Sequence, residues 1–561
     1  MKRILLCCLV ICMSIMALMP AVSAQTEQLP SGISDTELAS TLDAFLEGKK
    51  GNHAAVAVEV FRGDQTLYTN LFGYVDEAQT VALTEDSVLE WGSASKLLVW
   101  VSAMQLVQDA KLDLNGDIRQ YLPENFLGNL RYDEPITMLN LMNHNAGFEE
   151  TDFVLEVLNK EDLMSLEAYL AKYQPRQKFR PGEVVAYSNW GAALAGLVVE
   201  KVSGMPFSAY VQERIFAPLG MIHSAVAADL SDNPWVAEKR NDFVSYDPMG
   251  ELVSEPTKVY ILPYPAGMCV STLSDFTVFA KALLNRDARL LSQEGFDRLY
   301  TPSLCYTDTD KARLYHGFLV DYDFAVPIVG HDGNTAGGSS RLLLDLENGI
   351  GMVVLTNQLG GSVYRTKMAE LVFGSSDLHI EIDGHYMPAR SVFSGPSKLF
   401  NQLFAYNACH ITTPLVDGMY INILDDRFEL STCDYLLMDG SFLLMDALTV
   451  VWAVGALMCL AELLIRLLRL KKCKCNAKWA TMGYCLLLSF PLILFAGPIS
   501  PWIMLGYGVL LAAFTVCYLL QVVKRWKELG TLSRILVCEK LLIFAVCVVN
   551  LLAWDLIAVW L

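Results

Sequence analysis

The chain has 561 residues, of which 61 are acidic and 42 basic, so its formal net charge is −19. This acidity argues against nucleic acid or an anionic lipid surface as the main partner. The 8 histidines are scattered along the chain and form no ligand-like cluster, which argues against a histidine-rich metal site.

Residues 1–24 have the pattern of a secretory signal peptide. Two basic residues precede an apolar run from Ile4 to Met19, and Val22-Ser23-Ala24 satisfies the small-residue rule for cleavage before Gln25. An uncleaved membrane anchor is the alternative interpretation. In either case the sequence predicts that the segment after residue 24 is exported.

The first candidate site is Ser93-Ala94-Ser95-Lys96, at the start of a stretch, Ser95–Ala110, that we expect to be helical. Its hydroxyl and amine are three residues apart, so they share one helical face near the positive end of the helix dipole. Serine needs a neighbouring base and a positive field to become a nucleophile, and Lys96 can provide both. Taken alone, the motif is explained better by an ordinary serine in a first helical turn.

A second motif, Tyr187-Ser188-Asn189, precedes another expected helix, Trp190–Val202. If Tyr187 lies buried beside Lys96, burial lowers the pKa of the amine and the facing cation lowers the pKa of the phenol. Either group can then hold or release the proton of Ser93. Asn189 can brace Lys96 or donate to a substrate carbonyl group.

The third motif is His331-Asp332-Gly333, followed by Asn334. We interpret it as an edge strand in which His331 is a hydrogen-bond donor and Gly333 lets a substrate backbone approach closely. The backbone N–H groups of Asn334 and Ser93 would form the oxyanion hole that stabilises a tetrahedral intermediate.

In this order and spacing, the three motifs resemble the serine β-lactamase and penicillin-binding-protein superfamily, and within it the class C β-lactamase-like serine hydrolases. The resemblance extends from about residue 35 to about residue 375. Further segments resemble family landmarks: Lys111-Leu112-Asp113-Leu114, Tyr121-Leu122-Pro123-Glu124, Ile136-Thr137, His144-Asn145-Ala146-Gly147, Pro265-Ala266-Gly267, Ser271-Thr272-Leu273-Ser274-Asp275 and the strand pair within residues 330–357.

The resemblance implies an α+β catalytic domain over residues 35–378, with an antiparallel sheet flanked by helices and a helical lobe. It implies that Ser93 is the acylated nucleophile, Lys96 its partner and Tyr187 the general base. Asn189 becomes a supporting donor, and His331 stands where other branches have a lysine. No cofactor or metal is implied.

Two departures from the family pattern bear on the substrate and the mechanism. Acidic Asp332 lies beside His331, which disfavours a carboxylate-bearing ligand. The sequence also offers no separate deacylating glutamate, so Tyr187 has to activate the second nucleophile as well. His144 is expected to be structural and to brace a turn.

Residues 379–440, named here the β module, break into short alternating pieces. Strands are expected at 419–424, 427–431 and 435–438, separated by acidic turns. A spacer between the catalytic domain and a membrane is the favoured interpretation. Cys409 and Cys433 either pair as a disulfide or remain buried free thiols.

Residues 441–561 contain four apolar runs, each close to the roughly 20 residues that span a bilayer. The runs cover residues 442–465, 479–496, 502–523 and 535–561. Lysine and arginine cluster between the first and second runs and between the third and fourth, which makes both loops cytoplasmic by the positive-inside rule. The sequence, whose mean hydropathy is +0.34, thus predicts a four-helix region in a bacterial-type plasma membrane, with the catalytic domain outside.

These features predict a membrane-anchored serine hydrolase that forms an acyl-enzyme on Ser93. Cell-wall peptides, D-amino-acid peptides, β-lactams and small esters all remain open as substrates, so the partner is a small molecule or peptide and not a nucleic acid. The alternative is a non-catalytic sensor or immunity protein whose hydrolase-like ectodomain binds a ligand. The sequence does not determine the oligomeric state.

Overall fold

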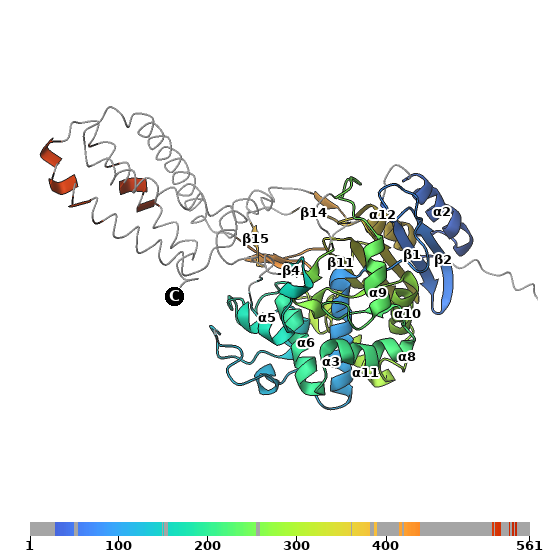
Figure 1. The fold of residues 1–561 in the computed structure, drawn as a ribbon, viewed down its shortest axis with the longest axis horizontal. Helices are drawn as coiled ribbons and strands as arrows, with labels where there is room; N and C mark the ends of the chain where they lie inside the picture. The colour runs from blue at the N-terminus through green and yellow to red at the C-terminus, as the bar shows by residue number, and fades with distance from the viewer. Residues whose placement is uncertain are drawn as a thin grey trace, which may run out of the picture.

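The computed structural model describes residues 28–437 with gaps, and scattered residues between 516 and 546 (Figure 1). The gaps are 50–53, 129, 149, 151–154, 254–257, 361, 382–385, 390–414 and 418–419. The expected signal peptide, Cys409 and nearly all of the four expected spans lie outside the described residues. Where the chain is described, no helix is both long enough and apolar enough to cross a membrane.

An eight-stranded antiparallel sheet forms the centre of the catalytic region, in the order β2-β1-β13-β12-β11-β10-β9-β8. Its first strand pairs with a strand almost 300 residues later, from Val56 opposite Thr356 to Arg62 opposite Ile350. The strands are β1 (Val56–Arg62), β2 (Gln65–Phe72), β8 (Leu304–Cys305), β9 (Ala312–Tyr315), β10 (Phe318–Asp321), β11 (Ile328–Asn334), β12 (Ser339–Asp345) and β13 (Ile350–Thr356).

Both faces of this sheet are covered by helices. Side chains alternate between the two faces of a strand, so Met352 and Val354 of β13 pack in one apolar core, and Val353 and Leu355 pack in the other. Helices α2 (Asp35–Glu47) and α12 (Ser362–Phe373) cover the first face. Helix α10 (Leu273–Leu284) and the helical lobe cover the second face, toward the bottom of Figure 1.

The helical lobe is built around two helices that carry the first two motifs. Helix α3 is buried on nearly every side, as expected for a helix that is apolar all round. Helix α6 begins where the Ser188 hydroxyl accepts a hydrogen bond from the Gly191 N–H at 2.9 Å, and it ends at left-handed Gly204. The lobe contains α3 (Lys96–Gln108), α4 (Met138–Met142), α5 (Leu166–Lys172), α6 (Asn189–Ser203), α7 (Phe207–Val211), α8 (Ala217–Leu219), α9 (Pro234–Lys239) and α11 (Gln293–Leu299).

Short strands complete the catalytic region and the β module. β3 (Leu89–Glu90), β5 (Ser224–Ala225) and β7 (Val270–Ser271) form one small sheet, and β4 (Glu156–Val157) and β6 (Tyr260–Ile261) form another. The β module contains β15 (Tyr386–Pro388), β17 (Asn422–Ile423), β18 (Arg427–Glu429) and β19 (Asp434–Leu437) in one sheet, and β14 (His379–Glu381) and β16 (Leu415–Asp417) in a second. The α+β architecture is confirmed, and the three strands expected in the module form as β17, β18 and β19, whereas β14, β15 and β16 were not predicted.

Candidate active site

Ser93 lies in a single 3₁₀ turn, η1 (Gly92–Ser95), that leads directly into α3. The backbone of this turn touches β11. A Cβ atom on Gly92 would lie 2.6 Å from the backbone nitrogen of Asn334, and a Cβ atom on Gly333 would lie 1.8 Å from the carbonyl oxygen of Trp91. Both positions therefore require glycine, and this close approach brings the first and third motifs together.

The contact at Gly333 corrects one prediction. The sequence interpretation reserved the space beside this glycine for a substrate backbone. In the structure, the carbonyl group of Trp91 fills that space and also accepts a hydrogen bond from the Ser340 hydroxyl at 2.6 Å. Gly333 therefore lets the turn Gly92–Ser95, named here the nucleophile turn after the role predicted for Ser93, lie against β11.

Lys96 is fully buried, and three protein oxygens lie within hydrogen-bond distance of its Nζ atom. The Nζ atom lies 3.0 Å from Ser93 Oγ, 2.7 Å from Asn189 Oδ1 and 2.8 Å from the carbonyl oxygen of Ala266. Of the two roles considered for Asn189, the structure bears out the bracing of Lys96. The amine and the hydroxyl of the first motif are in direct contact.

Tyr187 lies over the same amine, with its ring centroid 4.9 Å from Lys96 Nζ. The Tyr187 ring also packs against His144, with the two ring centroids 4.3 Å apart. His144 Nδ1 also accepts a hydrogen bond from the Ser188 N–H at 3.2 Å. The prediction that His144 is structural is confirmed, because its ring supports the second motif from behind.

His331 contacts Tyr187 through Nε2, which lies 3.3 Å from the phenol oxygen. The other ring nitrogen, Nδ1, lies 2.5 Å from the carbonyl oxygen of Asp332. A carbonyl oxygen can only accept, so Nδ1 carries the proton and Nε2 carries the lone pair. Burial, reinforced by the charge of Lys96, lowers the pKa of His331 to about 4, so the ring is neutral near pH 7.

This tautomer corrects the role predicted for His331. The sequence interpretation made it a donor, whereas the neutral ring presents Nε2 as an acceptor. The phenol of Tyr187 therefore donates its proton to His331 in this arrangement.

The prediction of an edge strand at the third motif is also wrong for the strand as a whole. β11 lies between β12 and β10, but its pairing with β10 covers only residues 328–330, and the pairing with β12 continues to Asn334. Residues 331–334 therefore have a strand on one side only. Their other side faces the nucleophile turn.

Asp332 is held by two arginines. One of its carboxylate oxygens lies 2.8 Å from Arg341 Nε, and the other lies 3.7 Å from Arg365 Nη1. Arg341 is shared with Asp321 at 2.6 Å, and Asp321 and Asp323 line the same cavity as Asp332. The expectation that Asp332 disfavours a carboxylate-bearing ligand stays a prediction.

A cavity of about 400 Å³ opens beside these groups and is lined by residues of all three motifs. Its wall includes Ser93, Tyr187, His331 and Asn334. The remaining lining residues belong to β10 to β12, the neighbouring loops and the β module: Tyr306, Leu319, Val320, Asp321, Tyr322, Asp323, Ile328, Gly330, Asp332, Arg341, Leu343, Tyr420, Leu430, Ser431 and Thr432. The oxyanion-hole role of the Ser93 and Asn334 N–H groups remains a prediction, and both residues border the cavity as it requires.

Glu150 is a residue of the site that the sequence interpretation missed. Its side chain is only 1% exposed and accepts hydrogen bonds from the backbone N–H groups of Asn189 and Trp190. A carboxylate at a helix N-terminus is favoured by the helix dipole, so Glu150 fixes the start of α6 and with it Asn189. No local pattern indicates this contact, because the partners are about 40 residues apart.

Comparison with known proteins agrees with this geometry. The Beta-lactamase family model matches residues 38–375, which is more than half of the chain. Penicillin-binding protein 4 of Amycolatopsis lactamdurans is 27% identical over 365 residues, covering 62% of this chain and 89% of that protein. Protein flp of Staphylococcus aureus (strain MRSA252) is 23% identical over 337 residues, covering 59% of this chain and 64% of that protein.

Among solved structures, the D-amino acid amidase from Ochrobactrum anthropi SV3 aligns with a TM-score of 0.48 and 21% identity, over 60% of this chain and 97% of that one. The match to the family model decides the assignment. This chain belongs to the Beta-lactamase family and is a serine hydrolase.

Proposed function

We propose that the protein is a membrane-anchored, extracytoplasmic serine hydrolase of the class C-like branch, which cleaves amide or ester bonds through an acyl-enzyme on Ser93. The observation that carries this proposal is the 3.0 Å contact between Lys96 Nζ and Ser93 Oγ at a cavity that Tyr187 also lines. The pairing of Tyr187 and Asn189 around one buried lysine supports the class C-like assignment.

In acylation, Ser93 Oγ attacks the substrate carbonyl carbon, and its proton passes to the pair formed by Lys96 and Tyr187. The bond to the leaving nitrogen or oxygen breaks as the pair returns a proton to that atom. Water then attacks the ester carbonyl and gives one proton to the pair, and the pair returns a proton to Ser93 Oγ. No further residue is needed to balance the reaction.

The pair can accept the proton of Ser93 only when one of its members has lost its own proton. Lys96 Nζ is placed for this transfer by its contact with Ser93 Oγ, and the Tyr187 phenol is held by His331.

For the substrate, we propose the acyl compounds of the cell wall and their analogues: D-amino-acid peptides, β-lactams and small esters. The names of the relatives, a penicillin-binding protein among them, support this class.

Membrane anchoring is supported by the four apolar runs after residue 441 and by the basic loops between them. A non-catalytic sensor is less well supported, since ligand binding alone does not require Ser93, Lys96 and Tyr187 to be intact and in contact.

The test is covalent labelling of the full-length protein with a fluorescent fluorophosphonate, followed by mapping of the added mass. We expect the mass on Ser93, no labelling of Ser93→Ala, and at least about 100-fold slower labelling of Lys96→Ala, since general-base catalysis contributes about that much or more. Lys111→Ala, an exposed lysine outside the cavity, is the matched control and should label at the wild-type rate. Substrate turnover that survives Ser93→Ala would rule out the proposed acyl-enzyme.

A further inference from the structure

Three consecutive residues of the active-site cavity come from outside the family domain. Leu430, Ser431 and Thr432 line the cavity together with Ser93 and Tyr187, although the family match ends at residue 375. They form the turn between β18 and β19 of the β module. The spacer role predicted for this module stays a prediction, and its turn also borders the active-site cavity.

The turn is fixed to the chain segment that carries Tyr187. The Tyr187 N–H donates to the carbonyl oxygen of Thr432 at 3.1 Å, and the Asp434 N–H donates to the carbonyl oxygen of Val185 at 2.9 Å. Ala186 and Cys433 form the antiparallel bridge between these two bonds. Cys433 is buried, and Cys409, its candidate disulfide partner, lies outside the described residues.

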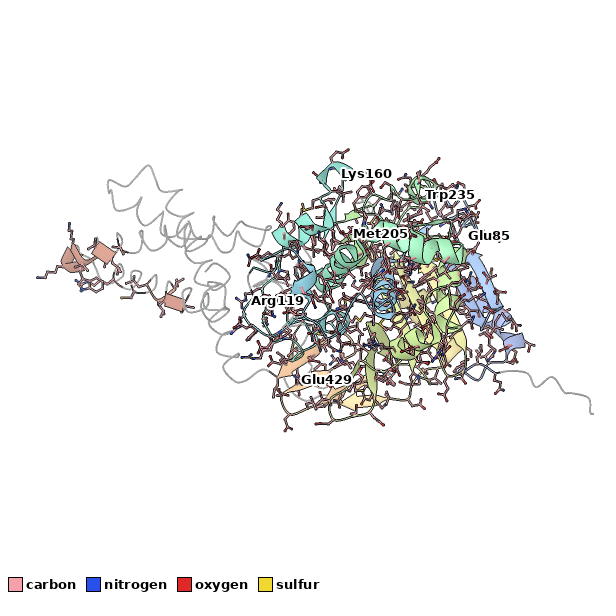
Figure 2. The ribbon with its side chains drawn as sticks, turned by 90° about the horizontal axis from the view of Figure 1, so that it is seen from below. Glu85, Arg119, Lys160, Met205, Trp235 and Glu429 are labelled. Carbon is pink, nitrogen blue, oxygen red and sulfur yellow. The ribbon has the colours of Figure 1, made fainter. Side chains whose placement is uncertain are left out.

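Buried polar contacts anchor the rest of the module. Asp434 and Arg313 form an ion pair at 2.7 Å, and neither side chain is more than 3% exposed. Glu429, labelled in Figure 2 on the orange strands of the module, accepts hydrogen bonds from the Thr307 N–H at 2.8 Å and from Asn422 Nδ2 at 2.9 Å. Buried charges with specific partners fix one arrangement of the module, because any other arrangement leaves a charge unpaired.

The position of the turn indicates which part of a substrate it meets. Tyr187 belongs to the pair that returns a proton to the leaving atom, so the leaving group has to pass beside Tyr187. The turn is bonded to the backbone of Tyr187 and borders the same cavity. A side chain on the turn can therefore restrict the leaving group without touching the nucleophile.

We propose that residues 430–432 form a specificity-determining wall that limits the size of the leaving group. This inference rests on the proposed acyl-enzyme at Ser93. It assigns to the β module a direct role in substrate choice, in addition to any role in linking the catalytic domain to the membrane.

The test compares two series of esters with the full-length protein. One series has a constant acetyl group and leaving groups of increasing size, from phenol to 2-naphthol. The other has a constant phenol leaving group and acyl chains from acetyl to hexanoyl. In Ser431→Trp, which narrows the cavity, we expect kcat/KM to fall at least tenfold more for naphthyl acetate than for phenyl acetate.

The acyl series should change by less than twofold, and the deacylation rate should equal that of the wild type, because the leaving group has already departed. Leu430→Ala widens the cavity at this wall and should increase the relative kcat/KM for naphthyl acetate. It provides a second test if the tryptophan variant folds poorly. Ile423→Trp, on the exposed side of the same module, is the matched control and should change neither series.

The proposed wall is wrong if kcat/KM falls equally in both ester series, or if neither wall variant changes the preference for leaving-group size. In these cases fluorophosphonate should still label Ser93, so the proposed function would stand. Ester turnover without acylation of Ser93 in the wild type would instead overturn the proposed function. The two failures are therefore separable in one set of proteins.

Discussion

At the scale of single residues, a backbone carbonyl group determines which nitrogen of His331 faces Tyr187 without a proton. The Asp332 carbonyl holds the His331 proton on Nδ1, which leaves Nε2 to accept from the phenol. His331 is buried beside Lys96, so the neutral ring is the stable form in the folded protein. The neutral histidine thus orients the phenol by accepting its hydrogen bond.

The depressed pKa of His331 predicts how folding stability depends on pH. In the unfolded chain this residue gains a proton below about pH 6.5, whereas in the folded protein it does so only near pH 4. The unfolded state therefore binds more protons between these values, and stability is lost as the pH falls through this window. Between pH 8 and pH 5 the wild type should lose about 2 kcal/mol more than His331→Gln, measured by urea unfolding. Parallel pH curves for the two proteins would contradict a neutral, buried His331.

At the scale of elements, the site depends on two segments that meet only in the folded chain, the nucleophile turn and the end of β11. Their contact is possible because both Gly92 and Gly333 lack a Cβ atom. A second contact of this kind joins the turn 430–432 of the β module to the backbone of Tyr187.

Gly333→Ala tests the first of these contacts. Its Cβ atom would lie 1.8 Å from the Trp91 carbonyl oxygen, so the nucleophile turn has to move away from β11. Since a shift of about 1 Å can cost about 100-fold in rate, we expect fluorophosphonate labelling to slow by about that factor. Gly128→Ala is the control, because its Cβ atom would meet nothing closer than 3.7 Å. Labelling of Gly333→Ala at the wild-type rate would show that the turn tolerates the displacement.

Asp434→Ala tests the anchoring of the β module. It removes the nearer of two carboxylates beside the buried charge of Arg313 and leaves only Glu429 at 4.0 Å, so we expect a loss of up to about 3–5 kcal/mol of stability. The comparison is Asp297→Ala, which breaks its exposed pair with Arg286, worth about 1 kcal/mol or less. Urea denaturation of both variants measures the difference, and equal losses would mean that the Arg313 pair contributes little.

The sequence predicted elements with a strong local pattern and missed contacts that depend on tertiary pairing. The strand at 350–356 and the helix that begins after Asn189 have continuous apolar patterns, and they form as expected. The family resemblance predicted that the three motifs meet at one site, and residues of all three line one cavity. The interior position of β11, the acceptor role of His331 and the contact of Glu150 with α6 leave no periodic trace, since each depends on partners distant in the chain.

At the scale of the whole molecule, the cavity wall and the first expected span are close in sequence. The chain from Thr432 to Phe442 reaches at most ~35 Å even when fully extended. If Phe442 begins a span, the active site works within that distance of the bilayer surface. Substrates attached to the membrane or to the adjacent wall then lie within reach.

The expected topology can be tested by cysteine labelling in intact cells. Cys473 and Cys475 lie in the first basic loop, so a membrane-impermeant maleimide should reach them only after permeabilisation. Asp425→Cys, in an exposed turn of the β module, should react without permeabilisation. A variant with serine at both positions shows which part of the maleimide signal comes from these two cysteines. If they are labelled in intact cells, the predicted orientation is wrong.

The bond between the Tyr187 N–H and the Thr432 carbonyl also has a consequence for biosynthesis. A growing polypeptide contains Tyr187 some 245 residues before the backbone partner of that residue exists. Since domains fold as they emerge, at about 5–20 residues per second, at least 12 seconds or so pass before Thr432 can join the cavity wall. That wall is complete only when translation has all but reached the expected membrane segments.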